Sequence, residues 1–302
     1  MRIPKDLRQT IERVHGERGR EWLDKFPDLI SECRERWSLN LDRPFANLSY
    51  NFVLPATMPD RKKVVLKLGV PCPELTAETA ALDLFAGVGA ARLLAHDARR
   101  GVLLLERVLP GTPVCELVSE AEATRIAATL MRQLWRSPPA NHNFPSLVIW
   151  FQAFAKLRNK FGGGSGPFPA KLFDQAEHTF AVLNASSDRS PVLHGDLHHA
   201  NILFSEERGW LAIDPKGVCG DPGYEVGAFM LNRLPVNASE SATIEVLAQR
   251  LSIFSAELGI DKERLRQWSL CQAVLSALWD FEDSADWRPT LSLALMLEKL
   301  AK

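Results

Sequence analysis

Asp196, Asn201 and Asp214 have the side-chain types and the spacing that phosphoryl transfer requires. Asp196 and Asn201 stand five positions apart in H-G-D-L-H-H-A-N, and Asp214 follows in I-D-P-K-G. Phosphoryl transfer needs an acceptor for the proton of the attacking hydroxyl, oxygen ligands for Mg²⁺ and a cation for the phosphates that stay behind. Asp196 could act as the base, while Asn201 and Asp214 could supply the hard oxygen ligands that Mg²⁺ prefers.

The separation of Asp196 from Asn201 equals that of the base and the metal-binding Asn in the loop H-R-D-x-x-x-x-N. Two short apolar runs, I-L-F and W-L-A-I-D, lie on either side of a polar E-E-R-G turn between Asn201 and Asp214. This pattern predicts a β-hairpin that places Asp214 beside Asn201. We expect His194 to anchor the loop by hydrogen bonding rather than to take part in the chemistry.

A competing interpretation makes His194, His198 and His199 ligands of a zinc ion in a hydrolase. His194 and His198 stand four apart, which on a helix would put them on one face. The β-like runs around the segment disfavour a helix, and His198 and His199 then read as ordinary loop residues.

A lysine in an apolar strand could supply the cation. In V-V-L-K-L-G (64–69), alternation puts Val64 and Leu66 on one face and Lys67 on the other. A buried lysine needs a carboxylate partner, and Glu78 on the next expected helix is the natural one, as in the Lys–Glu pair of kinase folds. The alternative is an edge-strand lysine that points to water.

The rest of the pattern predicts an α+β, bilobal architecture. Residues 1–107 form a small N-terminal lobe of mixed sheet and helix, and residues 108–302 form a larger, mostly α-helical C-terminal lobe. Residues 161–169 (F-G-G-G-S-G-P-F-P) read as a mobile loop rather than a phosphate cradle, because they follow a helix and carry no lysine. Hydrophobic periodicity predicts strands over 48–55, 64–69 and 103–108, and helices over 5–36, 74–85, 116–136, 145–160, 170–185, 239–258, 261–282 and 289–301.

Over most of its length the sequence resembles the aminoglycoside and hydroxyurea phosphotransferases, antibiotic-resistance kinases with a protein-kinase-like fold. The motif I-D-P-K-G (213–217) is closer to the streptomycin-type branch of this family than to kinases at large. The resemblance rests on W-x-L-x-L with L-S-Y-N-F-V (37–53), V-V-L-K-L-G (64–69), E-x-x-A-L (78–82), G-x-G-A-A-R-L-L-A-H-D (87–97), L-L-L-E-R-V-L-P-G (103–111), H-G-D-L-H-H-A-N-I-L (194–203) and I-D-P-K-G (213–217).

The resemblance implies ATP and Mg²⁺ as cofactors, Asp196 as the catalytic base and Asn201 and Asp214 as metal ligands. Lys67, paired with Glu78, would position the α- and β-phosphates.

Two other segments would contact the nucleotide. Backbone groups of Glu106 to Val108 would meet the adenine edge at the hinge. The loop over 48–52 would cover the phosphates, and because it has no glycine, the side chains of Ser49 and Asn51 could help. Lys216 could add charge near the γ-phosphate or form a salt bridge with Asp221.

The acceptor site is expected to be acidic. W-D-F-E-D-S-A-D (279–286) places Asp280, Glu282 and Asp283 beside Trp279. If helical, Glu282, Asp283 and Asp286 share a face. Such a surface suits a cationic aminoglycoside such as streptomycin, while the alternative is a solvated helix end.

Bulk composition sets limits on partners and location. A formal net charge of −1 gives no global attraction to nucleic acid or membrane, and the five dispersed cysteines fit neither a disulfide framework nor a zinc site. Without a signal-like or membrane-spanning run, we expect a cytoplasmic protein, monomeric or weakly dimeric, that acts on a small molecule.

Two other functions remain compatible with this sequence. One is a metabolic kinase for a sugar, amino alcohol or hydroxyurea-like acceptor, and the other is a nucleotide-binding regulator without turnover.

Overall fold

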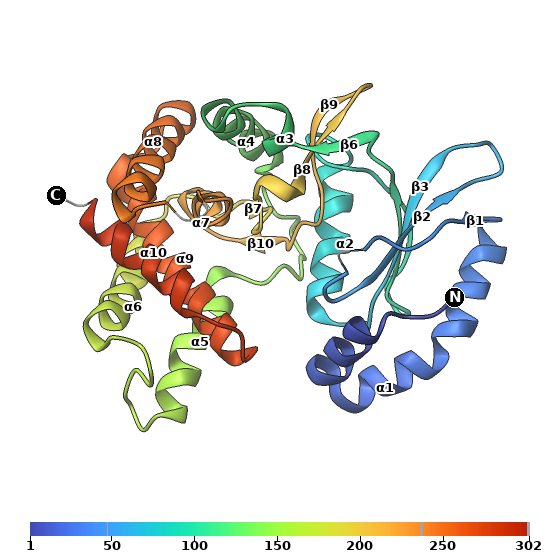
Figure 1. Ribbon diagram of the computed structural model, residues 1–302, viewed down its shortest axis with the longest axis horizontal. Helices are drawn as coiled ribbons and strands as arrows, with labels where there is room; N and C mark the ends of the chain where they lie inside the picture. The colour runs from blue at the N-terminus through green and yellow to red at the C-terminus, as the bar shows by residue number, and fades with distance from the viewer. Residues whose placement is uncertain (47, 236–237, 301–302) are drawn as a thin grey trace. The chain divides into compact units, whose positions relative to one another are not determined.

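The chain forms two units, Met1–Gly111 and Thr112–Lys302. The computed structural model describes residues 1–46, 48–235 and 238–300 (Figure 1). The first unit is a sheet with helices and the second is mostly helical, which confirms the α+β expectation. Assignment of residues 1–107 to nucleotide binding and 108–302 to catalysis stays a prediction.

The first unit is built on an antiparallel sheet with the strand order β1-β2-β3-β5-β4. The expected hairpin is confirmed, but its first strand begins at Phe52 rather than Leu48, because residues 49–51 are bends. The strands are β1 (Asn40–Leu41), β2 (Phe52–Thr57), β3 (Lys63–Leu68), β4 (Leu93–Asp97) and β5 (Val102–Glu106).

The register of the sheet decides which face each side chain occupies. Leu66 pairs with Leu104 and Lys67 with Leu103 across β3 and β5. Because side chains alternate between faces, Leu66 and Leu104 join the core under α1 (Lys5–Arg36). Lys67 and Leu103 lie on the opposite face, which is covered by α2 (Pro73–Phe85). The two helices flank the sheet in Figure 1, so a carboxylate on α2 can reach Lys67.

The second unit is organised around α9 (Lys262–Glu282), which packs against α5, α6, α7, α8 and α10. Its side chains are buried on nearly all sides, including Trp268 and Leu275. The helices before and after it are α3 (Val114–Leu117), α4 (Glu120–Leu134), α5 (Leu147–Lys160), α6 (Ala170–Ala185), α7 (Val226–Leu231), α8 (Glu240–Leu258) and α10 (Arg288–Lys299).

Short strands carry the segment with the chemical motif. β7 (Val192–Leu193) pairs with β10 (Val218–Cys219), and β8 (Ile202–Ser205) pairs with β9 (Gly209–Ala212). β6 (Pro110–Pro113) spans the junction of the units in the sequence. The β8–β9 hairpin is the one expected between Asn201 and Asp214.

Three elements differ from the expectation. The helix over 116–136 is interrupted before Ser119, whose hydroxyl accepts the N–H of Glu122 as the N-cap of α4. The strand β4 is half-exposed and α7 is short and buried. Neither segment therefore shows a clear hydrophobic periodicity, and neither was expected from the sequence. Among the described residues, no helix combines the length and apolar character needed to cross a bilayer.

Candidate active site

The Lys67 ammonium is buried and paired with Glu78 as expected. Lys67 Nζ lies 2.7 Å from Glu78 Oε1, and the two side chains are 5% and 8% exposed. The alternative of an edge lysine pointing to water is therefore wrong. A buried ion pair is weak evidence for stability alone, so its role as a phosphate-binding cation stays a functional prediction.

The Lys67→Met variant is expected to lose about 3–5 kcal/mol of unfolding free energy, because the Glu78 carboxylate stays buried without this cation. Lys67→Met/Glu78→Leu should regain most of that stability and none of the ATP turnover. Thermal unfolding and kcat/KM for ATP separate the two effects. Full turnover in the double variant would show that the pair only supports the fold.

The loop between Asp196 and Asn201 is held in a compact turn by its own atoms. Asn201 Nδ2 donates to the Asp196 carbonyl at 2.9 Å, and the His198 N–H donates to the same carbonyl at 3.1 Å. Residues His199–Asn201 form a 3₁₀ turn. Because the Asn201 amide nitrogen is engaged, its amide oxygen is the group suited to a cation.

The β8–β9 hairpin brings Asp214 near Asn201, at the end of the hairpin opposite its turn. Ile202 pairs with Ala212, and the Ile213 N–H donates to the Asn201 carbonyl at 2.9 Å. Asp214 has a φ of 63°, a left-handed conformation that Asp and Asn tolerate better than other non-glycine residues. A carboxylate and an amide oxygen form a donor set that fits Mg²⁺ rather than zinc.

The Asp196 carboxylate lies between two cationic or polar neighbours. Lys216 Nζ and His198 Nε2 are each 3.9 Å from its oxygens, and its side chain is 33% exposed. Burial raises the pKa of Asp196, and the charge of Lys216 opposes this effect. Lys216 thus lies near Asp196, whereas Asp221 pairs with Arg264. The expected salt bridge between Lys216 and Asp221 is therefore disfavoured, and a role of Lys216 near the γ-phosphate stays a prediction.

His194 anchors the loop as expected and is not exposed for catalysis. Its Nε2 donates to the Ile213 carbonyl at 2.9 Å, and its Nδ1 accepts the Asp196 N–H at 3.3 Å. Burial lowers the pKa of His194 to about 3, so the ring is neutral. The imidazoles of His198 and His199 contact Ala200 N and Glu120 instead, so the three histidines do not converge on one ion.

Glu225 holds the start of the loop and was not found from the sequence. Its carboxylate accepts the N–H of His194 at 2.7 Å and the N–H of Gly195 at 2.8 Å. Burial raises the pKa of Glu225 to about 7, while these two donors oppose the shift. Glu225 is the last residue of η2 (Pro222–Glu225) and stands 30 residues from Gly195. The segment carries no recognisable motif, so no local signal reveals this role.

The segments expected to contact the nucleotide have different environments. Ser49 is exposed, whereas Asn51 is half-buried. The amide oxygen of Asn51 lies against Gly69, and a Cβ added at Gly69 would be only 2.0 Å from this oxygen. The Glu106 carboxylate accepts the Arg92 N–H, and the Glu106 N–H donates to Arg92 O, both at 2.9 Å. This N–H is therefore engaged within the sheet, and Val108 is nearly buried.

The acidic segment after α9 is not a continuous helix, which corrects the expected shared face of Glu282, Asp283 and Asp286. The Ala285 N–H donates to Asp280 O, and the Ser284 N–H donates to Phe281 O. With Ser284 at φ 60°, these bonds end the helix as a Schellman motif. Asp280 also accepts the Thr290 hydroxyl at 2.8 Å, while Glu282 is exposed.

Two tryptophans connect this segment to the catalytic loop. Trp150 and Trp279 meet edge to face with ring centroids 5.7 Å apart. Gly195 has a φ of 81°, and a Cβ there would lie 2.9 Å from Trp150 Cη2. Trp150, which no sequence motif predicts, therefore lies between Gly195 and the helix end that carries Asp280.

Residues 36–284 match the family described as aminoglycoside/hydroxyurea antibiotic resistance kinase. Streptomycin 6-kinase from Streptomyces glaucescens is 30% identical over 285 residues, covering 94% of this chain and 92% of that protein. Hydroxyurea phosphotransferase from Kitasatospora aureofaciens is 32% identical over 298 residues, covering 97% and 84%.

Solved structures support the fold. The choline kinase LicA from Streptococcus pneumoniae superimposes with a TM-score of 0.64 at 15% identity, covering 91% of this chain and 99% of that one. Aminoglycoside phosphotransferase APH(4)-Ia, solved as a ternary complex with ADP and hygromycin B, gives a TM-score of 0.62 at 14% identity, covering 89% and 96%. The expected kinase-like fold is confirmed.

Proposed function

The chain belongs to the aminoglycoside/hydroxyurea antibiotic resistance kinase family, and from this premise we propose that it transfers the γ-phosphoryl of ATP to a hydroxyl of a cationic small molecule. An aminoglycoside such as streptomycin is the proposed acceptor. Mg²⁺ is the proposed metal, and when bound it would neutralise charge developing on the phosphates.

The observation that carries the proposal is the arrangement of Asp196, Asn201 and Asp214. The Asn201 side chain is bonded to the backbone of Asp196, and the hairpin register sets Asp214 next to Asn201. In the proposed reaction, Asp196 accepts the proton of the acceptor hydroxyl, while Asn201 and Asp214 hold the metal. Lys67, fixed by Glu78, binds the non-transferred phosphates.

The surroundings of Asp196 favour this role over a purely structural one. Burial raises its pKa, which makes the carboxylate a better proton acceptor than an exposed aspartate. Its side chain remains one-third exposed, so an acceptor hydroxyl can reach it. Ser49, Asn51 and the backbone from Glu106 to Val108 are proposed to complete the nucleotide site.

The proposed acceptor surface combines the edge-to-face tryptophans Trp150 and Trp279 with the carboxylates at the end of α9. Asp280, Glu282 and Asp283 lie within four residues of Trp279, and a Cβ at Gly195, the residue before Asp196, would lie 2.9 Å from Trp150 Cη2. A polycationic sugar-like molecule suits such a site, because charge-assisted hydrogen bonds bind its ammonium groups.

Neutralising the acceptor carboxylates one at a time is expected to raise the acceptor KM. Asp280→Asn, Glu282→Gln and Asp283→Asn should each weaken binding by about 1 kcal/mol or more where the carboxylate contacts the ligand. The wild-type KM should also rise with salt, because screening weakens these contacts. Steady-state kinetics at low and moderate ionic strength measure both effects.

Glu206→Gln, at the exposed turn of the β8–β9 hairpin, is the matched control and should leave KM unchanged. Salt-insensitive, unaltered KM values in all three acceptor variants would contradict the acidic site. They would favour a neutral acceptor, such as a sugar or a hydroxyurea-like compound.

A further inference from the structure

His199 stands between the proposed base and the proposed metal ligand, yet its side chain is buried. The ring is stacked on Phe229 with centroids 3.8 Å apart and an interplanar angle of 25°. Its Nε2 lies 3.3 Å from Glu120 Oε1, at the N-terminus of α4. The 3₁₀ turn that ends at Asn201 is thus attached to the protein interior through His199.

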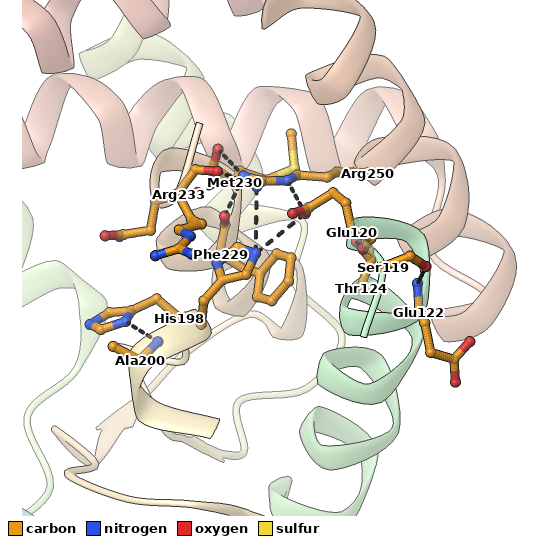
Figure 2. A network of polar contacts seen from close by, with 12 residues as sticks. Ser119, Glu120, Glu122, Thr124, His198, Ala200, Phe229, Met230, Arg233 and Arg250 are labelled. Atoms are coloured by element: carbon orange, nitrogen blue, oxygen red, sulfur yellow. Dashed lines mark hydrogen bonds and ion pairs between the residues drawn. The ribbon is translucent and has the colours of Figure 1, made fainter. Parts of the chain in front are cut away.

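Arg250 holds the same carboxylate from the other side. Its guanidinium is 0% exposed, and Nε donates to Glu120 Oε1 at 2.7 Å (Figure 2). Its Nη1 also donates to carbonyls at the C-terminal end of α7, those of Phe229, Met230 and Asn232, at 2.8, 3.0 and 2.8 Å. A cation stabilises a helix C-terminus. Arg250 therefore fixes both the end of α7 and the side chain of Glu120.

The charge states of these groups fit the hydrogen bonds. Burial opposes ionisation of Glu120, but the bonds from His199 and Arg250 prevail and lower its pKa to about 2. His199 Nε2 lies 3.3 Å from the same Glu120 oxygen that accepts from Arg250 Nε. An ionised Glu120 is therefore required to hold both partners.

The anchors at the two ends of the loop lie on one short stretch of chain. Glu225 accepts the N–H groups of His194 and Gly195, and Phe229, on the following helix α7, stacks on His199. Arg250 bonds the C-terminal end of that helix. The catalytic loop is therefore held at both ends by contacts from η2 and α7.

We propose that Glu120 and Arg250 are positioning residues for the catalytic loop. Their ion pair fixes the His199 imidazole and, through it, the turn that sets the separation of Asp196 from Asn201. This inference rests on the proposed function, because it assigns a consequence for phosphoryl transfer to contacts outside the reacting groups.

The expected consequence is a loss of rate rather than of binding. Displacing catalytic groups by about 1 Å can cost roughly 10²-fold in rate, whereas ATP and acceptor contacts elsewhere are unaffected. Glu120→Gln keeps the size of the side chain and removes the charge that holds both partners. We expect kcat to fall by about 10- to 100-fold and both KM values to stay within about twofold.

Glu122→Gln is the matched control, because Glu122 lies on the same helix turn, is half-exposed and pairs with surface Arg125. It should leave kcat unchanged. His199→Gln alone should lower kcat like Glu120→Gln, and the double variant should be no slower than the slower single one, since the two residues act in series. Additive losses, an unchanged kcat in Glu120→Gln, or KM values that rise together with a lowered melting temperature would overturn the proposal.

A second measurement does not depend on turnover. Backbone hydrogen exchange over residues 194–204 should be at least about tenfold faster in Glu120→Gln than in Glu122→Gln, with the Lys67 strand unchanged in both. Equal exchange in the two variants would overturn the anchor even if kcat fell. If the wild-type protein transfers no phosphoryl group at all, the proposed function fails, and the exchange difference still decides whether Glu120 holds the loop.

Discussion

The Asp196→Asn variant is expected to lower kcat by roughly three orders of magnitude and to leave the KM for ATP nearly unchanged. The amide has nearly the size of the carboxylate but cannot accept the proton of the acceptor hydroxyl. Asp196 is proposed to meet the acceptor rather than the nucleotide, so nucleotide affinity should persist. Initial rates over ATP and acceptor concentration, with nucleotide binding by calorimetry, measure the two quantities separately.

The stability of this variant provides an internal check. Because burial raises the pKa of Asp196, the folded protein disfavours its charge, and neutralising it should leave the melting temperature unchanged or higher. Asp188→Asn, at an exposed position, is the control for loss of one negative charge. A variant that keeps most of its kcat, or one that loses ATP binding while Lys67→Met retains it, would show that the roles are wrongly assigned.

The Asp214→Asn variant is expected to lose activity by orders of magnitude with its fold intact, because a neutral amide is a much weaker ligand for Mg²⁺ than a carboxylate. Asparagine is the suitable replacement because Asp214 has a φ of 63°, which asparagine tolerates and alanine does not. The dependence of the rate on Mg²⁺ concentration and the binding of Mn²⁺–ADP are the measurements.

The Asp214→Asn variant also tests whether Asp214 binds the metal or only maintains the shape of the loop. The loss should be partly offset by high Mg²⁺ if binding alone is weakened, whereas Asp214→Ala should lose both activity and stability. Near-normal turnover of Asp214→Asn at saturating Mg²⁺ would contradict the metal assignment.

Much of the site could be predicted because its signals are local. The apolar alternation around Lys67 and the carboxylate on the next helix follow directly from sequence spacing, and the pairing of Lys67 with Glu78 confirms them. The turn between two short apolar runs predicted the hairpin that carries Asn201 and Asp214. Backbone periodicity and turn chemistry act over a few residues, so a sequence displays them openly.

The residues that support the loop could not be predicted, because their partners are distant in sequence. Glu120 stands 130 residues from Arg250 and 79 from His199. Glu120 and Arg250 read as ordinary charged residues on separate helices, α4 and α8, and His199 reads as a loop residue, until the fold brings them together. One missed feature did have a signal: Ser119 with Glu122 three residues later is the pattern of a capping box, which would have placed the start of α4.

The turn that ends α9 carries no glycine that would mark it in the sequence. Glycine is the usual residue at the left-handed position that closes a helix, and here Ser284 takes it. The periodicity over 261–282 predicted the end of α9 correctly, whereas the shared face of Glu282, Asp283 and Asp286 required a helix that continues past Glu282.

Mass spectrometry of the acceptor after incubation with the protein, ATP and Mg²⁺ shows whether this chain phosphorylates a cationic small molecule. Streptomycin, hydroxyurea, a simple sugar and an amino alcohol are offered separately, with Asp196→Asn as the matched negative control. We expect streptomycin to gain one phosphoryl group in the wild-type reaction and none with the variant. Nucleotide binding without phosphorylation of any acceptor would contradict this expectation and favour a non-catalytic regulator, and phosphorylation of only a neutral acceptor would contradict the proposed cationic substrate.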